Sequence, residues 1–242
     1  MLYPSAGISE REVEKMLPED VSLHVSRIPM REPTHESLLH MADSVEESSK
    51  LLADANVDII AFNCTVGSLI KGRGYDQEII ERINQATGLP ATTTTTAVIA
   101  GLKTVGIKEL ILVSPYAEVV HQKEKAFLED EGFRLLNDQW LSLSNCVQQY
   151  ETDPLRWYEV VRALKDPRSD GYFISCGGIR VVGIIQRLET DLKKPVITSN
   201  QALVWHCLRM IGLQGPIEGF GQLLRISLVS ENSVALLSKS NH

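Results

Sequence analysis

Two stretches of the chain, IIAFNCTVGS (59–68) and GYFISCGGIR (171–180), share one pattern: an apolar run, then a cysteine, then small residues. A short apolar run that ends at turn residues is typical of a buried strand in a parallel sheet. The likeness of the two stretches indicates that one supersecondary unit occurs twice. In such a repeat, Cys64 and Cys176 take equivalent positions beyond the carboxyl ends of their strands, where open α/β sheets bind ligands.

A second pair of segments extends this repeat. LPATTTTTAVIAGLKTVGI (89–107) and KPVITSNQALVWHCLRMIGL (194–213) each begin with a proline that opens a strand and continue through hydroxyl residues. Each then finishes a helix pattern at Gly-Ile or Gly-Leu. Two copies of one unit predict two pseudo-symmetric halves.

Strand and helix patterns alternate along the rest of the chain. Strands are expected at 1–4, 21–28, 57–63, 92–96, 109–114, 133–140, 171–175 and 195–199. Helices are expected from Ser9, whose capping box includes Glu12, and at 36–56, 76–87, 117–131, 154–165, 182–191 and 200–211. This alternation predicts an α/β fold in which parallel sheets carry helices on both faces.

The repeat also predicts the domain boundaries. We assign residues 1–92 together with 200–224 to the first half, and residues 93–199 to the second half. Residues 225–242 carry no interpretable pattern and are treated as a C-terminal extension of unknown role.

The charge of the chain excludes several classes of partner. A formal net charge of −7 argues against a broad surface for nucleic acid and against docking on an anionic membrane. No apolar run is long enough to span a bilayer, and the N-terminus lacks the pattern of a signal peptide. We therefore expect a cytoplasmic protein with no nucleic-acid or membrane partner, and a homo-oligomer is the default assembly.

The four cysteines, at 64, 146, 176 and 207, are far apart and show neither zinc-ribbon nor thioredoxin spacing. We expect them to be free thiols, with no metal site, since no histidine–carboxylate spacing suggests one either. Cys207 lies in an apolar helix pattern and is expected in the core, whereas Cys146 follows a polar stretch and has no evident role.

Cys64 and Cys176 are the candidates for chemistry, although either can also be a small buried residue. Cys64 precedes Thr65-Val66-Gly67-Ser68, and Cys176 precedes two glycines, Gly177 and Gly178. Small residues at a strand end let backbone N–H groups turn toward an anion and let a ligand approach the backbone closely. The same arrangement predicts a lowered thiol pKa and a thiolate near neutral pH.

Two further side chains are candidates for binding a carboxylate. Tyr116 follows the strand pattern 109–114, where its hydroxyl can donate a hydrogen bond; the alternative is a loop aromatic that covers the core. Asn145 can hold a carboxylate, or it can cap a helix.

These residues resemble the aspartate/glutamate racemase superfamily, in the branch of maleate cis-trans isomerases and arylmalonate decarboxylases. The likeness runs from Tyr3-Pro4-Ser5 to Leu224. Its most specific motifs are Asn63-Cys64-Thr65, Gly88-Leu89-Pro90-Ala91-Thr92-Thr93, Ser114-Pro115-Tyr116 and Ser175-Cys176-Gly177-Gly178.

The resemblance implies two pseudo-symmetric α/β domains with an active site between them and no metal or organic cofactor. In maleate isomerases one cysteine adds to the alkene as a thiolate and the other handles a proton, which implies these roles for Cys64 and Cys176. Arylmalonate decarboxylases have only the second cysteine, with a glycine in the position of Cys64.

The resemblance also implies a set of substrate-binding residues. Thr65, Tyr116 and the Gly177 backbone match the carboxylate pocket of the decarboxylases, and Asn145 matches a carboxylate-binding asparagine of the isomerases. An asparagine that the isomerases carry after the first strand is replaced here by Ser5-Ala6-Gly7. The substrate-binding residues that we expect are Ser5, Thr65, Val66, Tyr116, Asn145 and Gly177.

The leading hypothesis is a cofactor-independent two-cysteine isomerase of a small mono- or dicarboxylate, most like a maleate cis-trans isomerase. One alternative is a racemase of an amino acid or hydantoin, in which one thiolate removes a proton and the opposite thiol supplies one. Another is an arylmalonate-type decarboxylase, which would not need Cys64. The non-enzymatic alternative is a binding protein for a small carboxylate, which would not need a reactive thiol.

Overall fold

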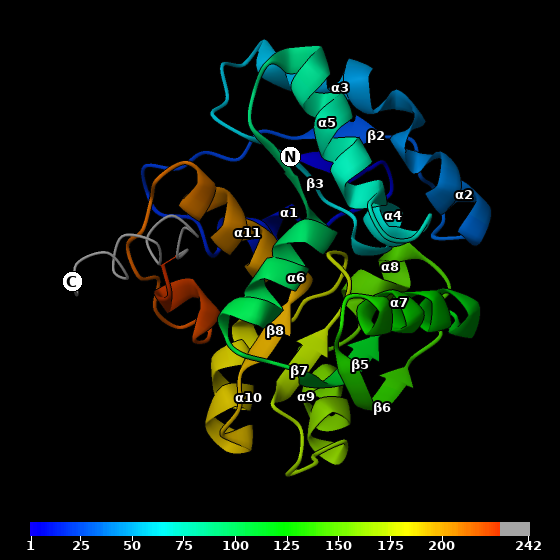
Figure 1. The fold of residues 1–242 in the computed structure, drawn as a ribbon, viewed down its shortest axis with the longest axis vertical. Coiled ribbons are helices and arrows are strands. Elements are labelled where there is room, and N and C mark those ends of the chain that lie inside the picture. The colour runs from blue at the N-terminus through cyan, green and yellow to red at the C-terminus, as the bar shows by residue number, and fades with distance from the viewer. Residues whose placement is uncertain (228–242) are drawn as a thin grey trace, which may run out of the picture.

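The computed structural model describes residues 1–227 and shows two four-stranded parallel sheets (Figure 1). The first sheet has the order β2-β1-β3-β4 and consists of β1 (Leu2–Pro4), β2 (Ser26–Ile28), β3 (Ile60–Phe62) and β4 (Ala91–Thr93). The second has the order β6-β5-β7-β8 and consists of β5 (Glu109–Ser114), β6 (Arg134–Trp140), β7 (Gly171–Ile174) and β8 (Val196–Thr198). The predicted α/β fold with two similar halves is confirmed.

The register of the strands shows how the halves correspond. Phe62 of β3 pairs with Thr93 of β4, and Ile174 of β7 pairs with Thr198 of β8. Because the third strand of each sheet ends at an equivalent residue, the cysteine two positions later falls at the same place in both halves. The repeat inferred from the sequence is therefore a repeat in three dimensions.

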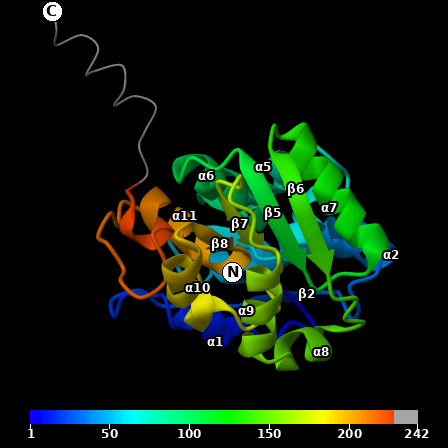
Figure 2. The ribbon, with the colours of Figure 1, turned by 90° about the horizontal axis from the view of Figure 1, so that it is seen from below.

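Helices connect the strands along the chain. Those that precede β5 are α1 (Glu10–Glu14), α2 (His35–His40), the 3-10 turn η1 (Met41–Ser44), α3 (Val45–Ala53), α4 (Thr65–Leu69), α5 (Tyr75–Thr87) and α6 (Thr94–Thr104). Those that follow β5 are α7 (Glu118–Asp130), α8 (Cys146–Glu151), α9 (Pro154–Ala163), η2 (Val182–Ile184), α10 (Ile185–Leu192), α11 (Ser199–Met210) and η3 (Leu223–Arg225). Figure 2 shows α9 and α10 on one side of the second sheet and α7 on the other.

The helices α6 and α11 pack against each other between the two sheets (Figure 1). Each begins where a strand ends in threonine, and that threonine caps the helix: Thr93 for α6 and Thr198 for α11. At the start of α11 a full capping box forms, in which the Gln201 side-chain oxygen also accepts from the backbone N–H of Thr198. Because each of these helices is capped by the last residue of its strand, the carboxyl ends of β4 and β8 are held in fixed positions.

Several sequence predictions need correction. Ser9 does precede α1, but its side chain makes no capping hydrogen bond, and the Glu12 side chain accepts from the backbone N–H of Val182 at 3.2 Å. The helix expected at 36–56 is divided into α2, η1 and α3. The strand expected at 92–96 ends at Thr93, where α6 begins.

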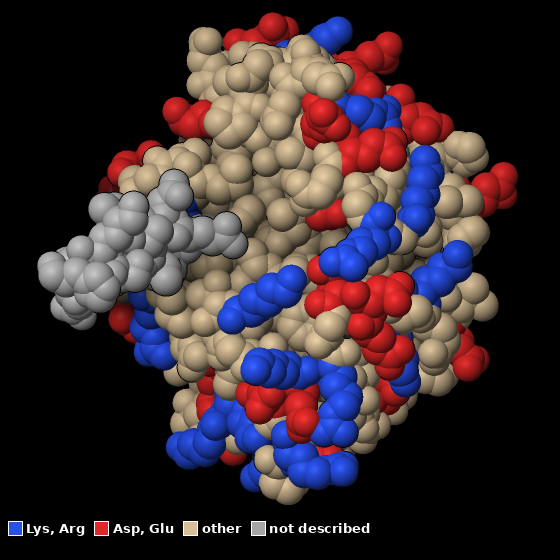
Figure 3. Space-filling model, in the orientation of Figure 1, with Lys and Arg blue, Asp and Glu red and all other residues tan. Residues whose placement is uncertain are grey.

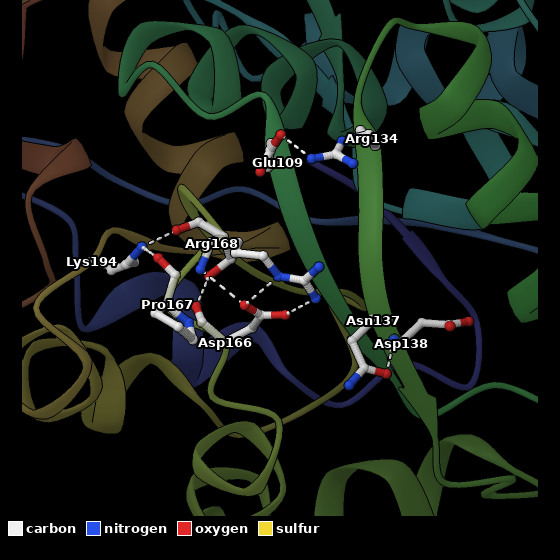
Figure 4. A network of polar contacts seen from close by, with 9 residues as sticks. Glu109, Arg134, Asn137, Asp138, Asp166, Pro167, Arg168 and Lys194 are labelled. Carbon is white, nitrogen blue, oxygen red and sulfur yellow. Dashed lines mark hydrogen bonds and ion pairs between the residues drawn. The ribbon is translucent and has the colours of Figure 1, made fainter.

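Charged contacts close the amino-terminal edge of the second sheet, away from the strand ends that bear the cysteines (Figure 4). Glu109 of β5 bonds Arg134 of β6, and the Arg168 guanidinium donates to Asp166 at 2.6 Å. Lys194 donates to the carbonyl of Pro167 at 2.9 Å. Figure 3 shows basic and acidic side chains interleaved over the lower half of the face that it displays.

Two expectations concern the whole chain. Within residues 1–227, no helix combines the length and the apolar character that crossing a bilayer requires. Of the extension 225–242, residues 228–242 lie outside the described residues. Ile226, which is described, accepts hydrogen bonds at its carbonyl from Trp205 and Arg209.

Candidate active site

A narrow cavity of about 40 Å³ lies at the carboxyl ends of the strands, and residues of both halves line it. Its walls are Tyr3, Pro4, Gly7, Ser9, Met30, Pro33, Leu38, Asn63, Cys64, Thr65, Val66, Tyr116, Cys146, Gln149, Cys176, Gly177 and Gly178. A wider hollow of about 430 Å³ lies at the opposite, amino ends of the first sheet's strands, but its lining contains a single cysteine, Cys207. The paired thiols make the narrow cavity the candidate site.

Cys64 reaches the cavity from the turn between β3 and α4. It is the N-cap residue of α4, and its Sγ atom accepts a hydrogen bond from the backbone N–H of Gly67 at 3.3 Å. A Cβ atom at position 67 would lie 2.9 Å from Cys64 Sγ and 2.9 Å from Met41 Sδ. Glycine is therefore required at 67 for the backbone to approach the sulfur.

Cys176 reaches the cavity from the turn after β7. Its Sγ accepts from the backbone N–H of Gly178 at 3.2 Å, and its own N–H donates to Ser199 Oγ at 2.9 Å. Its φ of 99° lies in the left-handed region, which costs a residue with a side chain about 1–3 kcal/mol. Strained residues of this kind cluster at functional sites, so the conformation supports a role for this thiol.

The predicted low thiol pKa is wrong for both cysteines. Burial raises the pKa of Cys64 to about 12, against the opposing hydrogen bond from Gly67. Burial likewise raises the pKa of Cys176 well above its usual range, although Gly178 and the Tyr116 hydroxyl stabilise the thiolate. Loss of hydration outweighs the backbone donors that the sequence suggested. For Cys176 there is also no helix directly behind it, because the next one begins at Val182.

Four of the expected substrate-binding residues lie at the cavity: Thr65, Val66, Tyr116 and Gly177. Thr65 donates through its hydroxyl to Ser199 Oγ at 2.8 Å. The Gly177 carbonyl accepts from Asn200 at 2.8 Å, and a Cβ atom at 177 would lie only 2.5 Å from Asn63 Oδ1. Thr65 is thus fixed by Ser199 at the start of α11, and Gly177 by Asn63 and Asn200.

The other two expected residues, Ser5 and Asn145, are not among the residues that line the cavity. The exposed Ser5 accepts from the backbone N–H of Met30 at 3.0 Å. Asn145 is the N-cap of α8 and accepts from the Gln148 backbone at 2.9 Å, which is the capping alternative. The structure therefore gives both residues local structural contacts instead of contact with the cavity.

Two residues that were not predicted to belong to the site, Cys146 and Gln149, line the cavity from α8. The Gln149 side-chain oxygen lies 3.5 Å from Cys176 Sγ. Their spacing of three residues places them on one helix face, and that is the signal in the sequence, once a helix is assumed there. His206 of α11 shares a hydrogen bond with Thr92 at 2.9 Å, and burial lowers its pKa to about 4.

The cavity offers thiols, hydroxyls and backbone groups. Within residues 1–227, no three His, Cys, Asp or Glu side chains gather in a way that could hold a metal ion. The two sulfurs of Cys64 and Cys176 at one narrow cavity are suited to nucleophilic addition and proton transfer.

Comparison with known proteins places the chain among enzymes. Residues 1–224 match a family model described as arylmalonate decarboxylase. The arylmalonate decarboxylase of Bordetella bronchiseptica is 27% identical over 211 residues, which cover 86% of this chain and 88% of that protein. The maleate isomerase of Geobacillus stearothermophilus is 26% identical over 239 residues, which cover 93% and 95%.

A solved structure has the same architecture. It is a cysteine-to-serine mutant of the maleate cis-trans isomerase of Nocardia farcinica with a covalently bound succinylcysteine intermediate. It superposes with a TM-score of 0.88 at 21% identity, covering 93% of this chain and 96% of that one. At this identity the likeness shows the fold.

Proposed function

The chain belongs to the arylmalonate decarboxylase family, and from this we propose that it is a cofactor-independent isomerase of a small carboxylate, most like maleate. Cys64 and Cys176 are its proposed catalytic pair. The observation that carries the proposal is that both thiols line the same narrow cavity between the two halves. A reaction that needed only Cys176 would leave the second thiol without a role.

In the proposed reaction, Cys64 attacks as a thiolate and forms a carbon–sulfur bond to one alkene carbon. The electron pair of the double bond moves toward the neighbouring carboxylate, and Cys176 gives its S–H proton to the other carbon. The carbon–carbon bond is now single and rotates. Return of the proton to Cys176 and departure of Cys64 restore the double bond in the trans geometry.

A succinylcysteine is the adduct expected from such a step, and that species was bound in the Nocardia farcinica isomerase. In this chain the thiolate needs help, because burial favours the neutral thiols. The donors that oppose burial are the backbone N–H groups of Gly67 and Gly178 and the hydroxyl of Tyr116. We assign them the task of making a thiolate accessible.

Tyr116 and the backbone of Thr65, Val66 and Gly177 are the proposed carboxylate-binding groups, since the Thr65 hydroxyl hydrogen is engaged by Ser199. All four residues line the cavity beside the two sulfurs. Donors placed in advance where negative charge develops are usually the largest source of rate acceleration. In the proposed reaction that charge develops on the carboxylate next to the carbon that Cys176 protonates.

Decarboxylation of a disubstituted malonate is the second candidate, and the match to the family model favours it. In that reaction carbon dioxide leaves and Cys176 protonates the resulting enediolate, so that Cys64 is dispensable. Because Cys64 lines the cavity and decarboxylation would not use it, we favour isomerisation over decarboxylation.

Proton NMR in deuterated water tests the proposal directly. The protein is incubated with maleate, with aryl malonates and with a panel of single-enantiomer acids. We expect the fumarate signal to appear from maleate and to be lost in Cys64→Ser. A deuterated monoacid from an aryl malonate, still formed by Cys64→Ser, would establish the decarboxylase instead. Exchange at the α-carbon of a chiral acid would indicate a racemase, and no change in any acid would indicate a binding protein.

A further inference from the structure

Glu124 is a carboxyl group in the interior of the protein behind the proposed catalytic pair. It lies in the middle of α7 and is completely buried. Its Oε1 atom is hydrogen bonded to Ser175 Oγ, whereas Oε2 is buried and has no hydrogen-bond partner in the described part of the chain. A buried carboxyl without a cation favours its neutral form, and burial raises the pKa of Glu124 to about 8.

A row of hydroxyl groups connects Glu124 to the cavity. Ser175 immediately precedes Cys176, and its Oγ lies 3.4 Å from Tyr116 Oη, within reach of a long hydrogen bond. The Tyr116 hydroxyl in turn stabilises the thiolate form of Cys176 by a hydrogen bond. The order of groups is therefore Glu124, Ser175, Tyr116 and then Cys176.

The number of hydrogens decides which way this row points. A serine hydroxyl has one hydrogen, and an ionised carboxylate only accepts. When Glu124 is ionised, the Ser175 hydrogen goes to the carboxylate, and the Tyr116 hydrogen is free to turn back to Ser175. When Glu124 is protonated, it donates to Ser175, the Ser175 hydrogen turns to Tyr116, and the Tyr116 hydrogen is left for the cavity.

Other ionisable groups near Glu124 do not set its charge. The helix α4, which packs on α7, consists of Thr65-Val66-Gly67-Ser68-Leu69 and carries none. On β6, Asp138 is engaged by His121 at 3.0 Å and by Lys125 at 3.1 Å. The groups that the charge of Glu124 does affect are Tyr116 and Cys64, whose pKa values it raises.

We propose that protonated Glu124 is a positioning residue that sets the direction of the Ser175–Tyr116 hydroxyl row and so aims the Tyr116 hydrogen at the substrate carboxylate. This inference rests on the proposed function, which places a carboxylate beside Tyr116. Ionisation of Glu124 reverses the row and adds a buried negative charge behind the site. Both effects weaken binding of an anion.

The test compares wild type with Glu124→Gln, whose uncharged amide keeps an N–H that can donate to Ser175 as protonated glutamate does and does not ionise. Glu129→Gln, on the exposed side of the same helix, is the matched control. The readouts are maleate turnover and succinate affinity from about pH 6 to pH 10. In wild type and the control, both are expected to fall up to about tenfold per pH unit above about pH 8, the pKa of Glu124. Glu124→Gln is expected to keep the neutral-pH values and to lose this fall.

Ser175→Ala separates the hydroxyl row from simple charge repulsion, because it interrupts the row and leaves the carboxyl in place. We expect it to keep neutral-pH succinate binding and to lose less affinity than wild type at alkaline pH, because the Tyr116 hydrogen has no serine to turn to and only the repulsion by ionised Glu124 remains. An alkaline fall as large in Ser175→Ala as in wild type, or an unchanged alkaline fall in Glu124→Gln, would overturn the proposal. A large loss of turnover in folded Glu124→Gln at neutral pH would also overturn it.

A readout without substrate keeps this inference separate from the proposed function. If wild type neither converts maleate nor binds succinate, the proposed function fails. The rate of Cys176 alkylation by iodoacetamide then tests the row, because a Tyr116 hydrogen aimed at the cavity stabilises the thiolate. Above about pH 8, where wild-type Glu124 ionises, alkylation is expected to be faster in Glu124→Gln than in wild type. Equal rates at every pH would refute the inference.

Discussion

The hydroxyl of Thr65 donates to the hydroxyl of Ser199 across 2.8 Å, and Ser199 in turn accepts from the backbone N–H of Cys176 at 2.9 Å. One serine therefore joins the residue after the first thiol to the backbone of the second. At the site this oxygen, Ser199 Oγ, links the two halves, and Asn63 adds a second link by donating to Asn200 Oδ1 at 3.4 Å. The relative position of the two cysteines depends on a contact that neither of them makes with its side chain.

Ser199→Ala should therefore disturb the site more than its size suggests. It leaves the buried N–H of Cys176 and the buried hydroxyl of Thr65 without a partner, at a cost of about 1–3 kcal/mol. We expect lower thermal stability together with a reduced kcat. Ser199→Thr, which keeps the oxygen, serves as the control, and equal losses in both variants would argue against the bridging role.

Cys64→Ser and Cys176→Ser should each abolish turnover and leave the fold intact. A two-thiol mechanism fails when either member is lost, whereas serine is close to cysteine in size. Activity and thermal melting are measured together, with Cys207→Ala as a control remote from the cavity. Retained activity in Cys64→Ser alone would point to decarboxylation.

A small dicarboxylate should protect Cys64, Cys146 and Cys176 from iodoacetamide, and should leave Cys207 unaffected. The first three cysteines line the narrow cavity, and Cys207 lines the hollow at the other end of the strands. Peptide mapping by mass spectrometry measures each site with and without succinate. Protection of Cys207, or labelling of Cys176 that is indifferent to the ligand, would place the binding site elsewhere.

Gly177→Ala should reduce activity and destabilise the protein by about 1–3 kcal/mol through overpacking. The new Cβ atom would lie 2.5 Å from Asn63 Oδ1 and 3.0 Å from Asn200 Oδ1. Gly183→Ala is the matched control, because a Cβ atom there meets nothing within 4 Å. Thermal melting and kcat/KM of the two variants give the comparison, and similar behaviour would show that the site tolerates a shift of Asn63.

The stability of the protein should fall between about pH 4.5 and pH 8 through Glu124, whose pKa burial raises from 4.5 to about 8. A raised carboxyl pKa means that the native state holds a proton that the unfolded state has lost, so stability declines as the pH rises through this window. The decline amounts to a few kcal/mol at most. Glu124→Gln should remove this part of the pH dependence in thermal melts, and parallel curves for the two proteins would contradict the buried neutral carboxyl.

The strong strands of the second half were predictable because burial on both faces makes them continuous apolar runs. The strand predicted at 109–114 is β5 with the same bounds, and that at 171–175 is β7 shortened by one residue. The first half was harder. Only 26–28 of the expected strand 21–28 forms β2, since the preceding residues lie largely at the surface.

Tertiary contacts explain what the sequence did not show. Glu12 had the spacing of a capping residue, but its partner is Val182, far away along the chain. The short helices α4 and α8 are too brief to be stable by themselves and depend on packing. Because α8 has no sequence signal of its own, Cys146 and Gln149 could not be assigned to the site. The pair of thiols was predictable because the repeat alone places both cysteines after equivalent strands. The domain boundaries at 92/93 and 199/200 stay a prediction.

At Cys176 the left-handed backbone conformation lowers the stability of the protein, whereas the proposed chemistry needs a cysteine there. Glycine is the residue of lowest energy in that conformation and would relieve about 1 kcal/mol or more, but it carries no sulfur. A mutant library screened only for heat resistance should therefore enrich glycine at 176, and on the proposed function those folded variants would have no turnover. Selection for stability at this position would then have to be combined with selection for activity.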